Sequence, residues 1–185
     1  ILYEVNLDKS PIINPKFKKN IKTKINFKID NTDYFYDAEA RIIGDWKDHI
    51  DVINNRSSLQ IKINNGSIGG ITRFRLYLPH TRNGENEIVW SIFNEILGYP
   101  TLYRKLIDVN FNGISYKALF EEIPNKEFLE RWSIRETAII EYDERQIWED
   151  RYFSKVKDNY SSYGNTYKID NSSFLKNHNS FLISL

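Results

Sequence analysis

The alternation of apolar and polar residues along several stretches constrains this chain more than any other feature. Successive side chains of a β-strand point to opposite faces of the sheet, so strict alternation predicts a strand with one buried face. On this basis strands are predicted at residues 25–29, 34–42, 57–63 and 71–78. Asn112-Gly113 joins two more apolar runs, 105–111 and 114–120, and this dipeptide is the strongest short signal for a β-hairpin. The first residues, ILYEVNL, are interpreted as part of another strand.

One stretch, residues 84–97, has instead the 3.6-residue period of an amphipathic helix. Its apolar positions are Ile88, Val89, Ile92, Phe93, Ile96 and Leu97, and Gly98 and Pro100 supply the stop signal. Shorter helices are predicted at 125–132, 143–150 and 172–178, and the glycine-rich NNGSIGG (64–70) is predicted to be a turn. The expected fold class is α+β, with a mainly antiparallel sheet and one packed central helix.

Composition excludes several classes of protein. The 185 residues include no cysteine, which rules out disulfides, thiolate metal sites and a cysteine nucleophile. No run approaches the ~18 apolar residues that a membrane helix needs, and a net charge of +1 favours neither nucleic acid nor an anionic membrane as partner. The chain also lacks methionine, even at position 1, and its last residues, NSFLISL, carry no closing signal. We therefore expect a fragment of a longer protein.

Fixed charges flank the connection between the fourth predicted strand and the central helix. Arg73 and Arg75 share one face of the strand, whereas Glu85 and Glu87 lie in the first turn of the helix. Two interpretations are open: an ordinary sheet-and-helix packing unit, or a cleft that holds a nucleotide. Phosphoryl transfer depends on charges held in position more than on covalent chemistry, and a strand with a packed helix is a rigid support for such charges.

Four segments, in this order, resemble the spore coat protein H (CotH) kinase family, a group of atypical protein kinases. They are ARIIGDWKDH (40–49), RFRLYLP (73–79), NEIVWSIFNEILGYPT (86–101) and FNGISYKALFEEIPNKEFLE (111–130). The match covers residues 36–132. The resemblance implies a protein-kinase-like N-lobe, ATP with Mg²⁺ or Mn²⁺ as cofactors, and phosphoryl transfer to Ser or Thr of a protein substrate.

The resemblance assigns nucleotide-binding roles to four residues, Arg75, Glu87, Glu122 and Gly44. Arg75 falls where the family has a phosphate-contacting lysine, and this is a departure, because a guanidinium keeps the charge but is longer and forks two hydrogen bonds. Glu87 matches the helix glutamate that pairs with that basic residue and aims it at phosphate. Glu122 matches the glutamate that ends the second hairpin strand, and Gly44 matches the glycine of the early loop.

The resemblance also divides the chain. Residues 1–30 are expected to form an N-terminal strand and basic loop, 31–132 the nucleotide lobe, and 133–185 a linker with the beginning of a truncated second lobe. The family's catalytic and metal-binding aspartates belong to that second lobe. They are expected beyond Leu185, so the fragment itself is expected to be inactive. The secreted and coat-associated members of the family imply export, although the residues leave the compartment open.

Two other functions stay open. Arginine in place of the family's lysine is compatible with a non-catalytic surface or scaffold protein that keeps the fold. A lysine-rich stretch also allows a nucleic-acid-binding module, although near-zero net charge makes a charged loop the default. Its lysines are Lys16, Lys18, Lys19, Lys22 and Lys24.

Other polar residues are given structural interpretations. The three histidines, His49, His80 and His178, lack metal-ligand spacing and are interpreted as surface residues. An acidic cluster is interpreted as a solvated helix face, and its members are Glu121, Glu122, Glu127 and Glu130.

Overall fold

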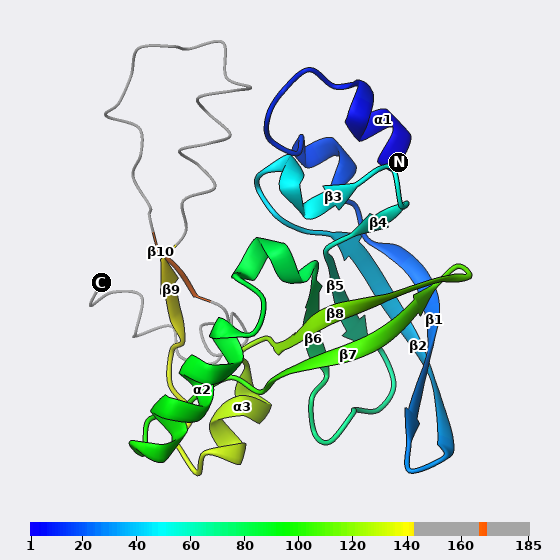
Figure 1. Cartoon of the computed structure of the whole chain (residues 1–185). Coiled ribbons are helices and arrows are strands. Elements are labelled where there is room, and N and C mark those ends of the chain that lie inside the picture. The colour runs from blue at the N-terminus through cyan, green and yellow to red at the C-terminus, as the bar shows by residue number, and fades with distance from the viewer. Residues whose placement is uncertain (143–166, 170–185) are drawn as a thin grey trace, which may run out of the picture. The chain divides into compact units, whose positions relative to one another are not determined.

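The structure is a computed structural model that describes residues 1–142 and 167–169 (Figure 1). The chain divides into two compact units, Ile1–Ile123 and Pro124–Leu185. The first unit contains a six-stranded sheet, several short helical turns and one longer helix, and the second contains a short helix and a pair of short strands. The predicted α+β class with a mainly antiparallel sheet is confirmed.

All neighbouring strands of the main sheet pair antiparallel. Across the sheet the strands are β1 (Ile21–Ile29), β2 (Thr32–Ile42), β5 (Leu59–Ile63), β6 (Arg73–Tyr77), β8 (Ile114–Glu122) and β7 (Arg104–Phe111). Strand β8, the last strand of this sheet in chain order, therefore lies between β6 and its own hairpin partner, β7 (Figure 1). The strands predicted from alternation and from the Asn-Gly turn are all confirmed, with ends that differ by a few residues.

The β1–β2 and β7–β8 hairpins of the sheet turn where the sequence has residues that tolerate positive φ. Asp30 and Asn31 join β1 to β2 with φ of 46° and 65°, and Asn112 and Gly113 join β7 to β8 with φ of 52° and 87°. A two-residue hairpin loop of this kind requires positive φ at both positions, which asparagine, aspartate and glycine adopt at low cost. These turns fix the register of both hairpins.

One face of the main sheet carries the core, and the sheet curls around it. Phe74 and Leu76 of β6 are buried there with Ala118 and Phe120 of β8. The rings of Phe74 and Phe120 stack with centroids 4.7 Å apart. The two faces of β6 are therefore as the alternation predicts, with the apolar residues inside and both arginines on the opposite face.

Residues Leu2–Leu7 form helix α1, so the strand predicted at the N-terminus is wrong. Val5 is buried in the core, and Leu2 packs against the same core. A helix brings residues three positions apart to one side, whereas a strand would point them to opposite faces. Packing of this pair on the core therefore favours the helix over the strand.

Between β2 and β5 the chain forms a small subdomain of the first unit. The charged segment that begins at Gly44 contains the 3-10 helix η2 (Lys47–His49), followed by the short paired strands β3 (Ile50–Asp51) and β4 (Arg56–Ser57). A further 3-10 helix, η1 (Pro15–Phe17), precedes β1.

Helix α2 (Asn86–Ile96) confirms the predicted central helix, but it turns its polar side toward the sheet. Ser91 is buried, whereas Val89, Trp90 and Ile96 are 63%, 62% and 77% exposed. Below the helix lie charged side chains of the sheet, and these bind polar groups of α2. The apolar stripe that predicts the helix is therefore a feature of the protein surface.

The second unit begins with α3 (Lys126–Arg131), which confirms the helix predicted at 125–132. Asn125 caps it, because its side-chain oxygen accepts a hydrogen bond from the backbone N–H of Phe128 at 3.2 Å.

Two short strands, β9 (Ile140–Tyr142) and β10 (Tyr167–Ile169), pair antiparallel in the second unit. The helices predicted at 143–150 and 172–178 lie outside the described residues, as does His178. Among the helices that the structure describes, none has the length and apolar character to cross a membrane.

Candidate functional site

A chain of ion pairs crosses the face of the sheet opposite the core. Arg75 of β6 and Glu121 of β8 are direct partners in the register, so their side chains leave the sheet on the same face. Nη1 of Arg75 donates to Oε1 of Glu121 at 3.0 Å, and the two side chains are 14% and 3% exposed. Glu121 therefore holds the guanidinium that the resemblance assigns to phosphate binding.

Arg104 of β7 extends this chain of ion pairs to helix α2. Its Nε donates to Oε2 of Glu121 at 2.8 Å and lies 3.4 Å from Oε2 of Glu87. Its Nη1 donates to the hydroxyl of Ser91 at 2.7 Å. Arg75 and Glu87 are thus connected through Glu121 and Arg104, rather than by the direct pairing that the resemblance implies.

Arg82, in the 3-10 helix η3 (Pro79–Arg82), extends the chain of ion pairs beyond Glu87. Its Nη1 lies 3.7 Å from Oε1 of Glu87, and its Nη2 donates to the hydroxyl of Tyr77 at 2.8 Å. The guanidinium also lies 4.2 Å from the centroid of the Tyr77 ring, a cation–π contact. Burial raises the pKa of Tyr77, so its hydroxyl stays protonated at neutral pH.

We call Arg75, Arg82, Glu87, Arg104 and Glu121 the ion-pair network. Three arginines and two glutamates give it a formal charge of +1. Its members come from two strands paired with β8, from β8 itself, and from two helical segments. Charges fixed in this way on rigid elements are suited to holding an anion, because little reorganisation is needed when it binds.

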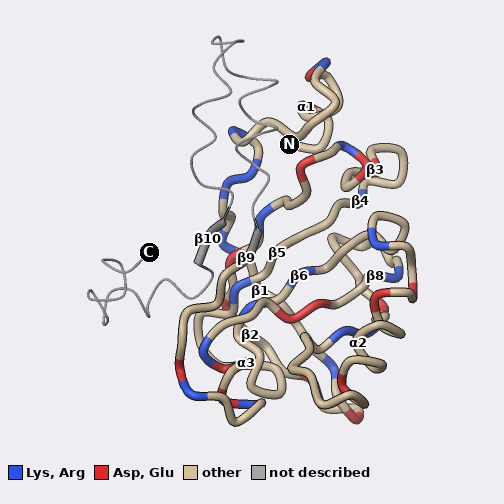
Figure 2. Tube along the Cα trace, turned by 90° about the vertical axis from the view of Figure 1, so that its left-hand side faces the viewer, with Lys and Arg blue, Asp and Glu red and all other residues tan. Residues whose placement is uncertain are grey.

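An open hollow of about 290 Å³ lies on the same face of the sheet. Its lining comes from the loop before β1 and from β2, β5 and β6, and consists of Asn20, Glu39, Arg41, Gln60, Lys62 and Arg73. Gln60 is the register partner of Arg75 on one side and of Arg41 on the other, so the hollow adjoins the ion-pair network. The Lys and Arg positions along these strands can be followed in Figure 2. We call these six residues the basic hollow.

Hydrogen bonds within the basic hollow orient part of its lining. Nη2 of Arg41 donates to Oε1 of Gln60 at 2.8 Å, and Nδ2 of Asn20 donates to Oε2 of Glu39 at 3.3 Å. Nε of Arg73 is buried and has no hydrogen-bond partner within the part of the chain that the structure describes. Three positive side chains face one carboxylate here, so the hollow carries a formal charge of +2.

Glu122, the third predicted site residue, is directed differently from Glu121. It is 1% exposed, and its Oε2 accepts a hydrogen bond from the backbone N–H of Tyr103 at 3.1 Å. The interpretation of Glu121 and Glu122 as a solvated helix face is wrong, because both lie in β8 and both are buried. The carboxylate of Glu122 fastens the end of β8 to the segment that leads into β7.

Gly44 lies outside both the ion-pair network and the residues that line the basic hollow. Its φ is +102°, and a Cβ built there would lie 2.1 Å from Cγ of His49. A side chain is therefore excluded by backbone conformation and by a close neighbour. The local geometry is enough to explain why position 44 requires glycine. Its role beside a nucleotide stays a prediction.

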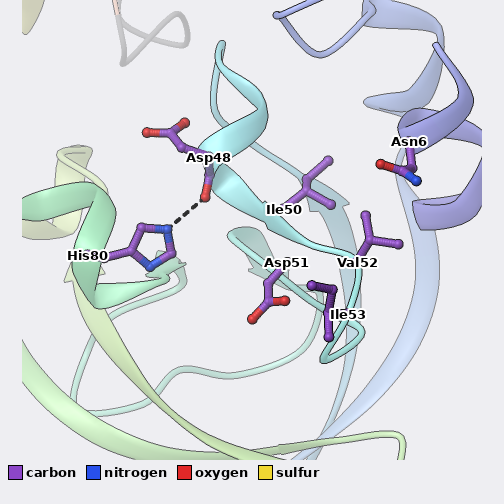
Figure 3. A pocket seen from close by; sticks show the side chains of 7 residues that line it. All are labelled: Asn6, Asp48, Ile50, Asp51, Val52, Ile53 and His80. Atoms are coloured by element: carbon purple, nitrogen blue, oxygen red, sulfur yellow. Dashed lines mark hydrogen bonds between the residues drawn. The ribbon is translucent and has the colours of Figure 1, made fainter. Parts of the chain in front are cut away.

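A second hollow, of about 390 Å³, lies beside β3 (Figure 3). Asp48 and Asp51 contribute to its lining, and Nε2 of His80 lies 2.9 Å from the backbone oxygen of Asp48. The hydrogen bond from Arg56 lowers the pKa of Asp51 to about 2, with a smaller contribution from Asn54, so this carboxyl is ionised at neutral pH. Two carboxylates make this hollow a poor site for phosphate. Within residues 1–142 and 167–169, no group of three side chains has the arrangement of a metal site.

The structure shows His49 half-buried in the small subdomain, whereas the sequence interpretation has it on the surface. Nδ1 of His49 lies 3.0 Å from the hydroxyl of Ser58, and that hydroxyl also accepts a hydrogen bond from the N–H of Leu78 at 3.0 Å. Which of the two groups donates in the His49–Ser58 hydrogen bond depends on the tautomer of the imidazole. Burial lowers the pKa of His49, although the charge of Asp48 opposes the shift.

We expect the protein to lose stability as the pH falls below about 6.5, the ordinary pKa of histidine in an unfolded chain. The folded state prefers neutral His49, so its stabilising contribution is complete above that value and is lost as the unfolded state takes up a proton. Urea unfolding at pH 7.5 and pH 5.5 measures the difference. In the His49→Gln variant the difference should become smaller, and an equal difference in both proteins would contradict this origin.

No family model matches the chain, and no curated protein matches it. The CotH resemblance therefore rests on the residues and their order alone, and stays a prediction.

Proposed function

We propose that residues 31–132 belong to the nucleotide lobe of a CotH-like atypical protein kinase. The complete enzyme would transfer the γ-phosphate of ATP, with Mg²⁺ or Mn²⁺, to Ser or Thr of a protein. The observation that carries the proposal is the connection of Arg75 with Glu87 through one network of ion pairs. In kinase-like folds a basic strand residue and a glutamate of the following helix are coupled, and the basic residue contacts phosphate.

In this proposal the arginines of the sheet contact the phosphates, and Glu87 acts on them indirectly. Glu87 binds Arg104, Arg104 binds Glu121, and Glu121 fixes Arg75 beside the basic hollow. The positively charged lining fits the phosphate chain of ATP. Carboxylates that hold the metal are assigned by the resemblance to a second lobe. The bound metal would neutralise the charge that develops on the phosphates during transfer.

A titration of Mg-ATP into the chain by isothermal calorimetry tests the proposal. Arg75→Ala is expected to weaken binding at least about tenfold, because a charge-assisted contact to phosphate contributes on the order of 1.5–3 kcal/mol. Arg75→Lys restores the residue of the family and keeps the positive charge beside Glu121. It should therefore bind within about threefold of the original chain, since the phosphate contact is retained.

Lys117→Gln is the matched control, because Lys117 lies on β8 in an exposed ion pair with Asp108. This variant should bind Mg-ATP like the original chain. Unchanged binding of Mg-ATP by Arg75→Ala, or no binding by the folded original chain, would contradict the proposed role of Arg75.

A non-catalytic scaffold protein with the same fold is the second candidate function. It is favoured by the pairing of Arg75 with the nearly buried Glu121, because that carboxylate already compensates the charge that phosphate would meet. The scaffold alternative predicts a stable, folded chain that binds no Mg-ATP in the same titration. The nucleic-acid-binding alternative predicts instead strongly salt-dependent binding of a mixed-sequence oligonucleotide.

A further inference from the structure

The basic hollow differs in chemistry from a site that encloses a nucleobase. Ligand sites of that kind are mostly apolar, with a few polar groups that fix orientation. Every residue that lines this hollow is polar or charged. Its volume of about 290 Å³ is also at the lower limit of the ~300–1,000 Å³ that is usual for ligand sites. The hollow therefore offers mainly charge to a ligand, and none of the six residues that line it is an aromatic residue on which a base could stack.

The positions of the basic groups follow from the register. Lys62 and Arg73 are direct partners on neighbouring strands, and Gln60 and Arg75 are the next pair on the same face. Such partners have Cβ atoms about 5 Å apart. Basic side chains are therefore closely spaced across β5 and β6, as the phosphates of an oligophosphate are closely spaced along its chain. An oligophosphate could contact several of them at once.

Arg73 supplies an independent observation that points to a ligand. Its Nε is buried, and no hydrogen bond to it occurs in the described part of the chain. A buried donor without a partner is costly, and such a group is generally satisfied by water, an ion or a ligand. This Nε is closed to solvent, so a phosphate oxygen would reach it only after the Arg73 side chain turns toward the hollow, and would then be a strong acceptor for the guanidinium.

We infer that the basic hollow recognises the phosphate chain of its ligand alone, so that it binds inorganic tripolyphosphate and triphosphates of any nucleoside with similar affinity. The inference rests on the proposed function for the choice of a phosphate ligand. It goes beyond that function in assigning the recognition to Arg73, Lys62 and Arg41 and in excluding a contribution from the base.

Replacement of Glu39 should change the affinity for phosphate in the direction opposite to replacement of Arg73. The carboxylate of Glu39 lines the same hollow and would repel phosphate, whereas Arg73 would attract it. Arg73→Gln removes one positive charge and leaves a shorter polar side chain, whereas Glu39→Gln removes one negative charge and keeps the shape of the side chain. A ligand held by charge in this hollow must respond to the two changes in opposite directions.

The experiment is calorimetry on the chain with sodium tripolyphosphate, ATP, GTP and adenosine, at low ionic strength because exposed charges are screened by salt. We expect dissociation constants for the first three ligands within about threefold of one another, and no binding of adenosine. Arg73→Gln should weaken the binding of tripolyphosphate at least about tenfold, and Glu39→Gln should strengthen it about threefold. Each variant changes one unit charge close to a partly exposed ligand. Lys117→Gln should leave the affinity for tripolyphosphate unchanged.

The outcomes separate this inference from the proposed function. If ATP binds at least about thirtyfold more tightly than tripolyphosphate and GTP, the base is recognised, so the inference fails while the proposed function stands. If none of the phosphates binds to the folded chain, both fail. Tripolyphosphate binding that does not respond to Arg73→Gln and Glu39→Gln in opposite directions places the ligand elsewhere and overturns the inference.

Discussion

Replacement of Glu121 by glutamine is expected to lower the free energy of unfolding by about 3 kcal/mol, because removing one partner of a buried ion pair leaves the other charges uncompensated. Glu121 is 3% exposed and binds both Arg75 and Arg104, at 3.0 and 2.8 Å. Glutamine keeps the shape of the side chain, so the loss reports charge and hydrogen bonding rather than packing. Urea unfolding of the variant and of the original chain measures it.

Asp108→Asn is the matched control for this prediction. Asp108 also pairs at 3.0 Å, with Lys117, but its side chain is 86% exposed. An exposed pair contributes only ~0–1 kcal/mol, so this variant should be nearly neutral. Equal effects of Glu121→Gln and Asp108→Asn would show that burial does not decide the strength of the ion-pair network.

Replacement of Gly44 by alanine is expected to destabilise the protein by about 3 kcal/mol, the sum of a strained backbone and an overpacked neighbour. The φ of +102° is unfavourable for any residue with a Cβ, and the new methyl group would lie 2.1 Å from His49. Thermal or urea unfolding measures the loss.

Two further variants separate the contributions at Gly44. Gly69 also has positive φ, +57°, but its Cβ would meet nothing within 4 Å, so Gly69→Ala should cost only about 1 kcal/mol of backbone strain. The double variant Gly44→Ala with His49→Gly removes the clash, because the close contacts are with Cγ, Cδ2 and Cβ of His49. It should be more stable than the sum of the two single effects predicts, because residues in contact are coupled. Additive effects would contradict the proposed contact.

The strands, the hairpins and the central helix could be predicted because local patterns specify them. Part of the site could also have been found in this way. A two-residue loop at Asn112-Gly113 pairs residues that lie equally far before and after it. Arg104 and Glu121 are such a pair. Their cross-strand ion pair therefore follows from the turn alone, although it is absent from the predicted site residues.

The other half of the site depends on contacts between distant parts of the chain. Arg75 meets Glu121 only because β8 pairs with β6, across the intervening helix and β7. Neither turn geometry nor alternation specifies that pairing, so Glu121 could be interpreted as a solvated residue.

The orientation of α2 shows the limit of the helical pattern. The periodicity predicts a helix with an apolar side, and an apolar side is generally expected to face the core. Here Glu87 and Ser91 face the sheet because Arg104 binds both, while Ile96 is 77% exposed. Buried charges on the sheet, which come from distant strands, decide which side of the helix faces inward.

Both proposals depend on phosphate binding at the sheet face that carries Arg73 and Arg75. The most direct measurement is a titration of Mg-ATP followed by NMR of the arginine side-chain Nε–H groups. We expect saturable shifts of the Arg73 and Arg75 signals, with the signal of Arg131 in α3 unchanged. Saturable shifts confined to other arginines, or none at millimolar Mg-ATP, would contradict it.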